Sequence, residues 1–173
     1  VFSEQEINEA LKREQPSSYF PTRDDIGHGT FLAGVAAGNE IPGKEFSGIA
    51  PLSQIIVVKC KEAKNSYREY YRVPSKVPCY QETDIMAGIM YILQVAYSLG
   101  RPVSICVGMG SNLGNHDGAS PLCHLIDINN MAGASIVACA GNEGPVGHHY
   151  EITKKEEEIQ IDVARASLGF VCE

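Results

Sequence analysis

One histidine in this chain has neighbours that would suit acid–base chemistry on a bound chain. His28 lies between Gly27 and Gly29, and Thr30 follows at once. The two glycines leave no Cβ beside the imidazole, so a bound chain could lie against it. Histidine titrates near neutral pH, which suits a general base. The alternative is a core histidine whose ring nitrogens are satisfied by backbone carbonyls.

After Phe31 and Leu32 comes a run of small residues: Ala33, Gly34, Ala36, Ala37 and Gly38. Small side chains at helical spacing let the helix backbone approach its neighbours closely. The run therefore predicts a short, deeply packed helix, and its first turn would carry His28 into a cleft.

A second candidate, Asn142, follows an apolar run near the end of the chain. Ser135–Ala140 is β-branched and small, which predicts a core strand, and Gly141, Asn142, Glu143 and Gly144 come directly after it. Open α/β sheets bind ligands at the carboxyl ends of their strands. An asparagine between glycines is more often a turn residue that tolerates positive φ. A functional role for Asn142 therefore depends on its position after this strand and on the presence of the His28 motif in the same chain.

Two motifs, D-x-x-G-H-G-T at Asp24–Thr30 and ASIVACAGNEG at Ala134–Gly144, resemble the subtilisin-like serine proteases (subtilases). The resemblance covers roughly residues 24 to 144. It implies a serine endopeptidase that hydrolyses peptide bonds in a protein or peptide substrate. In it His28 would be the general base and Asn142 the side-chain donor of the oxyanion hole.

The same resemblance assigns the segment Gly108, Met109 and Gly110 to substrate binding. This segment would pair with the substrate backbone and form one wall of the main specificity pocket. The family commonly has Asn and Ser where Cys106 and Gly108 stand, so this chain departs from the usual wall.

Two parts of the catalytic set are missing from this sequence. A serine hydrolase also needs a nucleophilic serine and a carboxylate that orients the histidine. The family's aspartate lies upstream in a D-[ST]-G setting, but Val1–Arg23 contains no Asp, and its G-T-S serine would lie beyond Glu173. We therefore expect a central fragment that is inactive by itself.

Two alternatives remain open at this stage. One is a non-catalytic subtilase-like (pseudoprotease) module for binding or regulation. The other is a cysteine hydrolase that pairs His28 with Cys139 or Cys106, although Cys60, Cys106 and Cys139 all fall in predicted core strands.

The elements that position these residues predict an α/β fold, an incomplete three-layer αβα arrangement of the subtilisin type. Its mainly parallel sheet would contain Gln54–Cys60, Val103–Val107 and Ser135–Ala140, with helices on both faces. An amphipathic helix is expected over Ser3–Glu14, with a capping box of Ser3 and Glu6 and a narrow apolar stripe of Ile7 and Leu11. Two more helices are expected, one capped by Thr83 that runs to about Ser98 with Gly100 past its end, and one from Ser120 to a stop at Gly133. An exposed sheet edge would make self-association possible.

Beyond this sheet, we expect residues 1–150 to form a partial subtilase domain and residues 151–173 to begin a β insertion. Alternating apolar residues predict a C-terminal β-hairpin that turns near residues 165–167. The long polar segment Lys61–Gln81 is either a binding loop or lid, or a solvated insertion. Together these insertions resemble the clostridial branch linked to spore germination, which implies an extracellular or spore-associated protein.

Composition argues against several other classes of protein. The net charge of −7 and the lack of a basic stripe argue against nucleic-acid binding, and no apolar run reaches membrane-spanning length. No C-x-x-C pair occurs among the six cysteines, so we expect no structural zinc and mainly reduced thiols, with disulfides still possible. We expect no cofactor; calcium is common in the family, but no carboxylate cluster is available to bind it.

Three further patterns are interpreted as structural. Gly108–Gly118 departs from a dinucleotide-binding fingerprint because Leu113 stands where the third glycine is needed. His124 and Asp127 are expected to be an exposed polar pair rather than metal ligands. His148 and His149 are adjacent, so an extended backbone would point them to opposite faces.

Overall fold

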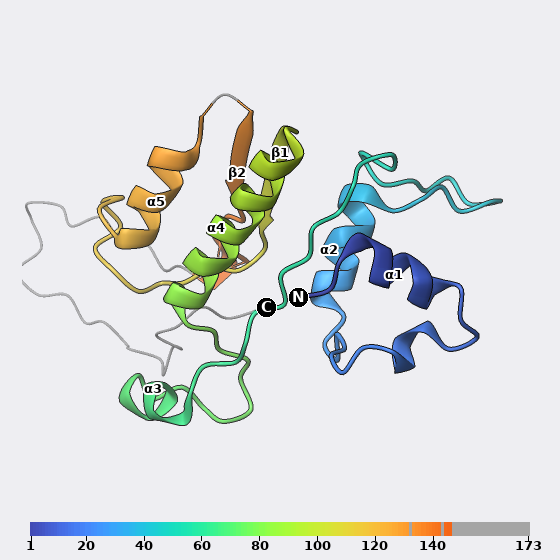
Figure 1. Ribbon diagram of the computed structural model, residues 1–173. Helices are drawn as coiled ribbons and strands as arrows, with labels where there is room; N and C mark the ends of the chain where they lie inside the picture. Colours follow the sequence, from blue (N-terminus) through green and yellow to red (C-terminus); the bar gives the residue numbers. More distant parts are fainter. Residues whose placement is uncertain (132, 143, 147–173) are drawn as a thin grey trace, which may run out of the picture. The chain divides into compact units, whose positions relative to one another are not determined.

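The computed structural model describes residues 1–131, 133–142 and 144–146, and it divides into two compact units, Val1–Gln54 and Ile55–Glu173 (Figure 1). The predicted C-terminal hairpin, the start of the β insertion and the boundary at residue 150 lie outside the described residues, as does the pair His148 and His149.

The first helix, α1 (Glu4–Leu11), begins with the capping box that the sequence predicts. The Glu6 N–H donates to Ser3 Oγ at 3.3 Å, and the Ser3 N–H donates to Glu6 Oε2 at 2.7 Å. The bond from the Ser3 N–H, together with one from the Ser3 hydroxyl to the same oxygen at 2.8 Å, lowers the pKa of the Glu6 carboxyl. The helix ends at Leu11 rather than at Glu14. Its apolar stripe is also less buried than expected, because Ile7 is 42% exposed and only Ala10 is buried.

A short 3-10 helix, η1 (Pro16–Ser18), leads on to α2 (His28–Ala37), which confirms the predicted helix. The prediction that α2 is deeply packed is wrong, since none of its residues is buried and Phe31 is 68% exposed. The reason is that a unit of this size has few apolar side chains with which to cover a helix that is apolar all round.

The close approach predicted for α2 is made by its backbone instead. Residues 48–50 run along its C-terminal end, where the N–H groups of Gly48, Ile49 and Ala50 donate to the carbonyls of Gly38, Val35 and Ala36. A Cβ on Gly48 would lie 2.3 Å from the Gly38 nitrogen, so only glycine fits there.

The second unit contains a parallel sheet of two strands, β1 (Val103–Val107) and β2 (Ala134–Ala138). Their register runs from Val103 opposite Ala134 to Val107 opposite Ala138. The Cys139 N–H also donates to the Val107 carbonyl at 3.1 Å, which extends the pairing by one residue. Both predicted strands are therefore confirmed.

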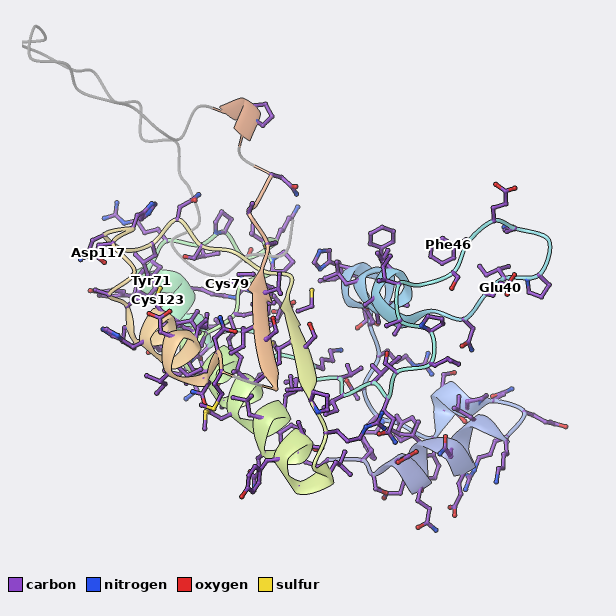
Figure 2. The ribbon with its side chains drawn as sticks, turned by 90° about the horizontal axis from the view of Figure 1, so that it is seen from above. Glu40, Phe46, Tyr71, Cys79, Asp117 and Cys123 are labelled. Atoms are coloured by element: carbon purple, nitrogen blue, oxygen red, sulfur yellow. The ribbon has the colours of Figure 1, made fainter. Side chains whose placement is uncertain are left out.

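Two helices, α4 (Glu82–Leu99) and α5 (Pro121–Asn129), pack on one face of this sheet (Figure 2). The buried cluster between them and the sheet contains Ile85, Ile89, Ile105, Val107 and Leu122. Helices on both faces were predicted, but within this unit the opposite face of the two strands is exposed, as at Cys106 and Val137. The α/β class holds, and the described residues of this unit contain no second helical layer.

The segment Gln54–Cys60 is extended but is not a strand of this sheet, contrary to the prediction. Burial alternates along it as in a strand, with Val58 half-buried and Val57 74% exposed. Val58 packs on α4, where a Cβ on Gly88 would lie 3.0 Å from its Cγ1. The division between the units falls at Gln54, so every other residue of this segment belongs to the second unit.

The ends of α4 and α5 agree in part with the predicted signals. Gly100 ends α4 in the left-handed conformation at φ 62°, and Ser120 caps α5 by accepting from the Cys123 N–H at 3.2 Å. However, Gln81 rather than Thr83 is the N-cap of α4, and α5 ends at Asn129, before Gly133.

The segment Lys61–Gln81, which we call the insertion, is folded rather than a plain loop. It contains the helix α3 (Asn65–Tyr70) and a small buried cluster of Ala63, Val73 and Cys79. An antiparallel bridge between Glu62 and Tyr80 closes its base. The sequence prediction missed this compact structure.

Candidate active site

His28 is the first residue of α2, and its side chain is half-buried. The preceding residue, Gly27, is the N-cap and has φ 85°, a left-handed conformation that glycine adopts without strain. Among the described residues, none forms a hydrogen bond with the imidazole ring. The described backbone carbonyls therefore do not hold this ring, and the general-base role of His28 stays a prediction.

The start of α2 is held by the carboxylate of Asp24, which takes the place of a capping side chain that Gly27 lacks. Its Oδ1 accepts from the N–H groups of Gly27 at 2.8 Å and Ile26 at 3.3 Å. Its Oδ2 accepts from the Thr30 hydroxyl at 2.6 Å and the Thr30 N–H at 2.9 Å. These bonds stabilise the charged form, and those from Thr30 contribute most, so the pKa of the Asp24 carboxyl lies well below its ordinary value.

The Asp24 carboxylate thus bridges both sides of His28. It binds the backbone before the histidine at Gly27 and both polar groups of Thr30 after it. From the sequence alone, Asp24 is recognised as part of the histidine motif, with no role of its own. The signal in the sequence is the spacing of Asp24, Gly27 and Thr30, each three residues from the next. Here the carboxylate that caps the helix lies three residues before the N-cap position rather than at it.

The other predicted site residues lie in the second unit, at one end of its sheet. Gly108, Met109 and Gly110 follow β1, and Gly141 and Asn142 follow β2. Because β1 and β2 are parallel and in register, both segments leave the sheet at the same end. Gly141 has φ 82°, and the exposed Asn142 follows this turn.

Within the segment after β1, the Met109 side chain packs against the core cluster. Its backbone neighbour Gly110 is exposed, and a Cβ there would meet nothing within 4 Å. A peptide that bound this segment would therefore contact main-chain groups rather than the methionine side chain. His28 belongs to the first unit and Asn142 to the second, so their position in one crevice stays a prediction.

A shallow hollow of about 430 Å³ lies at the opposite end of the sheet. Its lining residues belong to the amino ends of the two strands and to the residues just before them: Pro102, Val103, Ser104, Gly133, Ala134 and Ser135. It therefore does not coincide with the segments that carry the predicted site residues of this unit.

The cysteines do not lie as predicted. Cys106 and Cys139 are exposed, not buried in strand cores, because Cys106 lies on the face of β1 that α4 and α5 do not cover. No disulfide joins any two cysteines of the described residues. Exposure by itself gives neither thiol a base, and neither is hydrogen-bonded to His28 within that part of the chain.

Metal and membrane sites are likewise absent from the described part of the chain. No group of three or more His, Cys, Asp or Glu side chains is gathered there as a metal site would need. His124 and Asp127 are both exposed, as expected for a solvated pair. None of the described helices combines the length and apolar character that a membrane crossing requires.

Comparison with known proteins decides the family. The profile of the Subtilase family matches residues 2–162. The chain belongs to the subtilase family. This confirms the resemblance carried by the two motifs and the subtilisin-like α/β fold.

Two relatives show how much of a subtilase the chain represents. The solved structure of the Clostridium perfringens CspB protease is 32% identical with a TM-score of 0.70, and the match covers 86% of this chain but 30% of that one. Subtilisin-like protease 3 of Plasmodium falciparum (isolate 3D7) is 38% identical over 60 residues, which are 34% of this chain and 8% of that protein. The chain therefore spans less than a third of either relative.

Proposed function

We propose that this chain is the central part of a subtilisin-like serine endopeptidase in which His28 is the general base and Asn142 belongs to the oxyanion hole. The observation that supports the proposal is the set of four hydrogen bonds that the Asp24 carboxylate accepts at the start of α2. These bonds fix the backbone on both sides of His28. A histidine that takes a proton from a nucleophile needs a fixed position, because small displacements are costly in rate.

In this mechanism His28 takes the proton of a serine hydroxyl as that oxygen attacks the scissile carbonyl. The same imidazolium then gives the proton to the leaving amine. The Asn142 amide donates a hydrogen bond to the oxygen that becomes negative, and the backbone of Gly108 and Gly110 pairs with the substrate chain. The serine and the carboxylate partner of His28 belong to parts of the protein outside these residues.

The decisive experiment is an assay of the full-length parent protein on an unfolded protein substrate, with His28→Ala as the comparison. The parent should cleave, and the variant should lose nearly all cleavage. Equal cleavage by both proteins would remove His28 from the mechanism. The isolated chain should be inactive, and proteolysis by the purified chain that disappears with His28→Ala would contradict this expectation.

A non-catalytic subtilase-like module is the second candidate. The parent protein separates the two proposals, because a binding module would retain partner binding while both it and its His28→Ala variant fail to cleave any substrate.

A further inference from the structure

Positive charge is concentrated in the insertion of this otherwise acidic chain. Lys61–Gln81 has five basic residues and two acidic ones, so its net charge is +3, whereas the whole chain has −7. Arg68 is buried and forms an ion pair with Glu62 at 3.2 Å. Four exposed cations remain, which we call the basic patch: Lys61, Lys64, Arg72 and Lys76. None of them forms an ion pair with another described residue.

The buried Arg68 holds the two halves of the insertion together, so the basic patch is carried by one compact module. One nitrogen of its guanidinium donates to the carbonyls of Pro74 at 3.3 Å and Val77 at 2.8 Å, and another donates to Glu62. Glu62 lies between Lys61 and Lys64, and Lys76 lies between the two carbonyls in sequence. All four cations therefore belong to one folded module, and the fields of charges on one module add.

Exposed tyrosines lie on the same module. Tyr70 is 80% exposed and Tyr67 46%, and their rings lie 4.9 and 6.1 Å from that of the half-buried Tyr71 (labelled in Figure 2). Tyrosine is enriched at protein interfaces because it combines a large apolar ring with a hydrogen-bonding hydroxyl. Charge and aromatic surface together suit an acidic peptide chain.

The module lies at the end of the sheet where the substrate-binding segments emerge. The Lys64 N–H donates to the side-chain oxygen of Gln81, the N-cap of α4, at 3.4 Å. Because α4 leads through residues 100–102 directly into β1, it runs against the strand, and Ile85 near its start shares a cluster with Val107 at the end of β1. Figure 1 shows α3 at the start of α4, away from the amino end of β1.

We propose that the basic patch is a docking surface for an acidic, extended segment of the protein or peptide substrate, next to the segment Gly108–Gly110. This inference rests on the proposed endopeptidase function and adds the substrate class to it. A nucleic acid is the competing anionic ligand, and the experiment below compares it with the acidic peptide.

The test measures peptide binding to the full-length parent carrying His28→Ala, so that no peptide is cleaved during the titration. A Glu-rich peptide and its Gln counterpart of equal length, each with an uncharged dye, are compared by fluorescence anisotropy. The Glu-rich peptide should bind about fivefold tighter or more at low salt, and the preference should shrink as salt is added. Equal affinity for the two peptides would overturn the proposal.

A pair of matched variants locates the effect. Lys64→Gln with Lys76→Gln should reduce the preference for the Glu-rich peptide by about threefold or more, whereas Lys12→Gln with Lys44→Gln removes the same charge in the first unit and should leave it unchanged. An equal loss in both double variants would show a general charge effect and contradict a docking surface. A single-stranded oligonucleotide that bound tighter than the Glu-rich peptide would also contradict it.

The two proposals fail in different ways in these experiments. If the parent cleaves both peptides but binds them equally, the docking surface is wrong and the protease function stands. In the opposite case, the parent prefers the Glu-rich peptide and the double variant Lys64→Gln with Lys76→Gln loses this preference, but the parent cleaves nothing. The docking surface then stands and the endopeptidase function is wrong.

Discussion

At the scale of single residues, the position of His28 depends on a carboxylate that does no chemistry in the proposed mechanism. Asp24 accepts from Gly27 and from both polar groups of Thr30, so the histidine is held between two fixed backbone segments. Folding lowers the pKa of this carboxyl. Its contribution to stability is therefore complete above the ordinary aspartate pKa of about 3.9 and is lost only as the pH falls through the lowered value.

Removal of this carboxylate should impair catalysis more than substrate binding. We expect Asp24→Ala in the parent to lower kcat about 10- to 100-fold with little change in KM, because the general base loses its fixed position. Steady-state kinetics on a peptide substrate measure both constants. Asp25→Ala is the matched control, since Asp25 is exposed and its carboxylate forms none of these bonds. Equal losses in the two variants would show a general effect of charge.

Asn142 makes a different prediction at the same scale. If its amide donates to the oxyanion, Asn142→Ala should lower kcat by about 100- to 1000-fold, a magnitude taken from the oxyanion-hole asparagine of a subtilisin itself. KM should change little, because the bond forms in the transition state. A variant that retained full kcat would show that Asn142 is only a turn residue after β2.

At the scale of elements, local signals were predictable from the sequence and distant pairings were not. The caps at Ser3, Ser120 and Gly100 depend on residues within one or two turns, and the structure confirms each. The strand predicted at Gln54–Cys60 needed hydrogen-bond partners elsewhere, which β-branched composition does not specify. Likewise, the role of Asp24 was missed because a carboxylate outside the N-cap position holds the helix.

The insertion is the clearest case of a structure that composition conceals. Its polar residues suggest a loop, yet the buried guanidinium of Arg68 donates hydrogen bonds to two backbone carbonyls and to the Glu62 carboxylate. Burial of an unpaired charge or carbonyl is costly, so these partners and Arg68 depend on one another.

Truncation of that side chain should therefore unfold the insertion locally. We expect Arg68→Ala to cost about 3 kcal/mol in the free energy of opening of this module, because two half-buried carbonyls lose a charged donor. Hydrogen exchange of the Ala63 and Val73 amides, which donate to Cys79 and Arg68 carbonyls, reports this opening. Arg72→Asn is a suitable control, because asparagine tolerates the positive φ of 54° at this exposed position. Unchanged protection in Arg68→Ala would contradict the role of the guanidinium.

At the scale of the whole molecule, the described chain leaves one face of a parallel sheet without a helical cover from its own unit. Parallel sheets are usually covered on both faces. The family and the α/β class were predictable because the histidine motif and the asparagine motif occur in the order typical of the family, with predicted strands and helices between them. The exposure of Cys106 was not, because burial depends on what covers a strand and not on the strand's own residues.

Thiol labelling measures this exposure directly. In the isolated chain under native conditions, Cys106 and Cys139 should react with a thiol reagent well before Cys79, whose exposure is 5%. Mass spectrometry of the labelled peptides follows each site, and the unfolded chain gives the reference rate. In the full parent, slower labelling of Cys106 than in the isolated chain would indicate that other parts of the protein cover this face. Labelling of Cys79 as fast as Cys106 would contradict the packing of the insertion.

The helix that begins at His28 is fastened to the rest of its unit through main-chain groups at both ends. Asp24 binds its first turn, and residues 48–50 bind its last carbonyls, with Gly48 too near for any side chain. Its outward side chains take little part in this attachment. Substitutions on the outward surface of this helix should therefore leave the backbone of His28 in place, whereas an alanine at position 48 should displace the last turn of the helix.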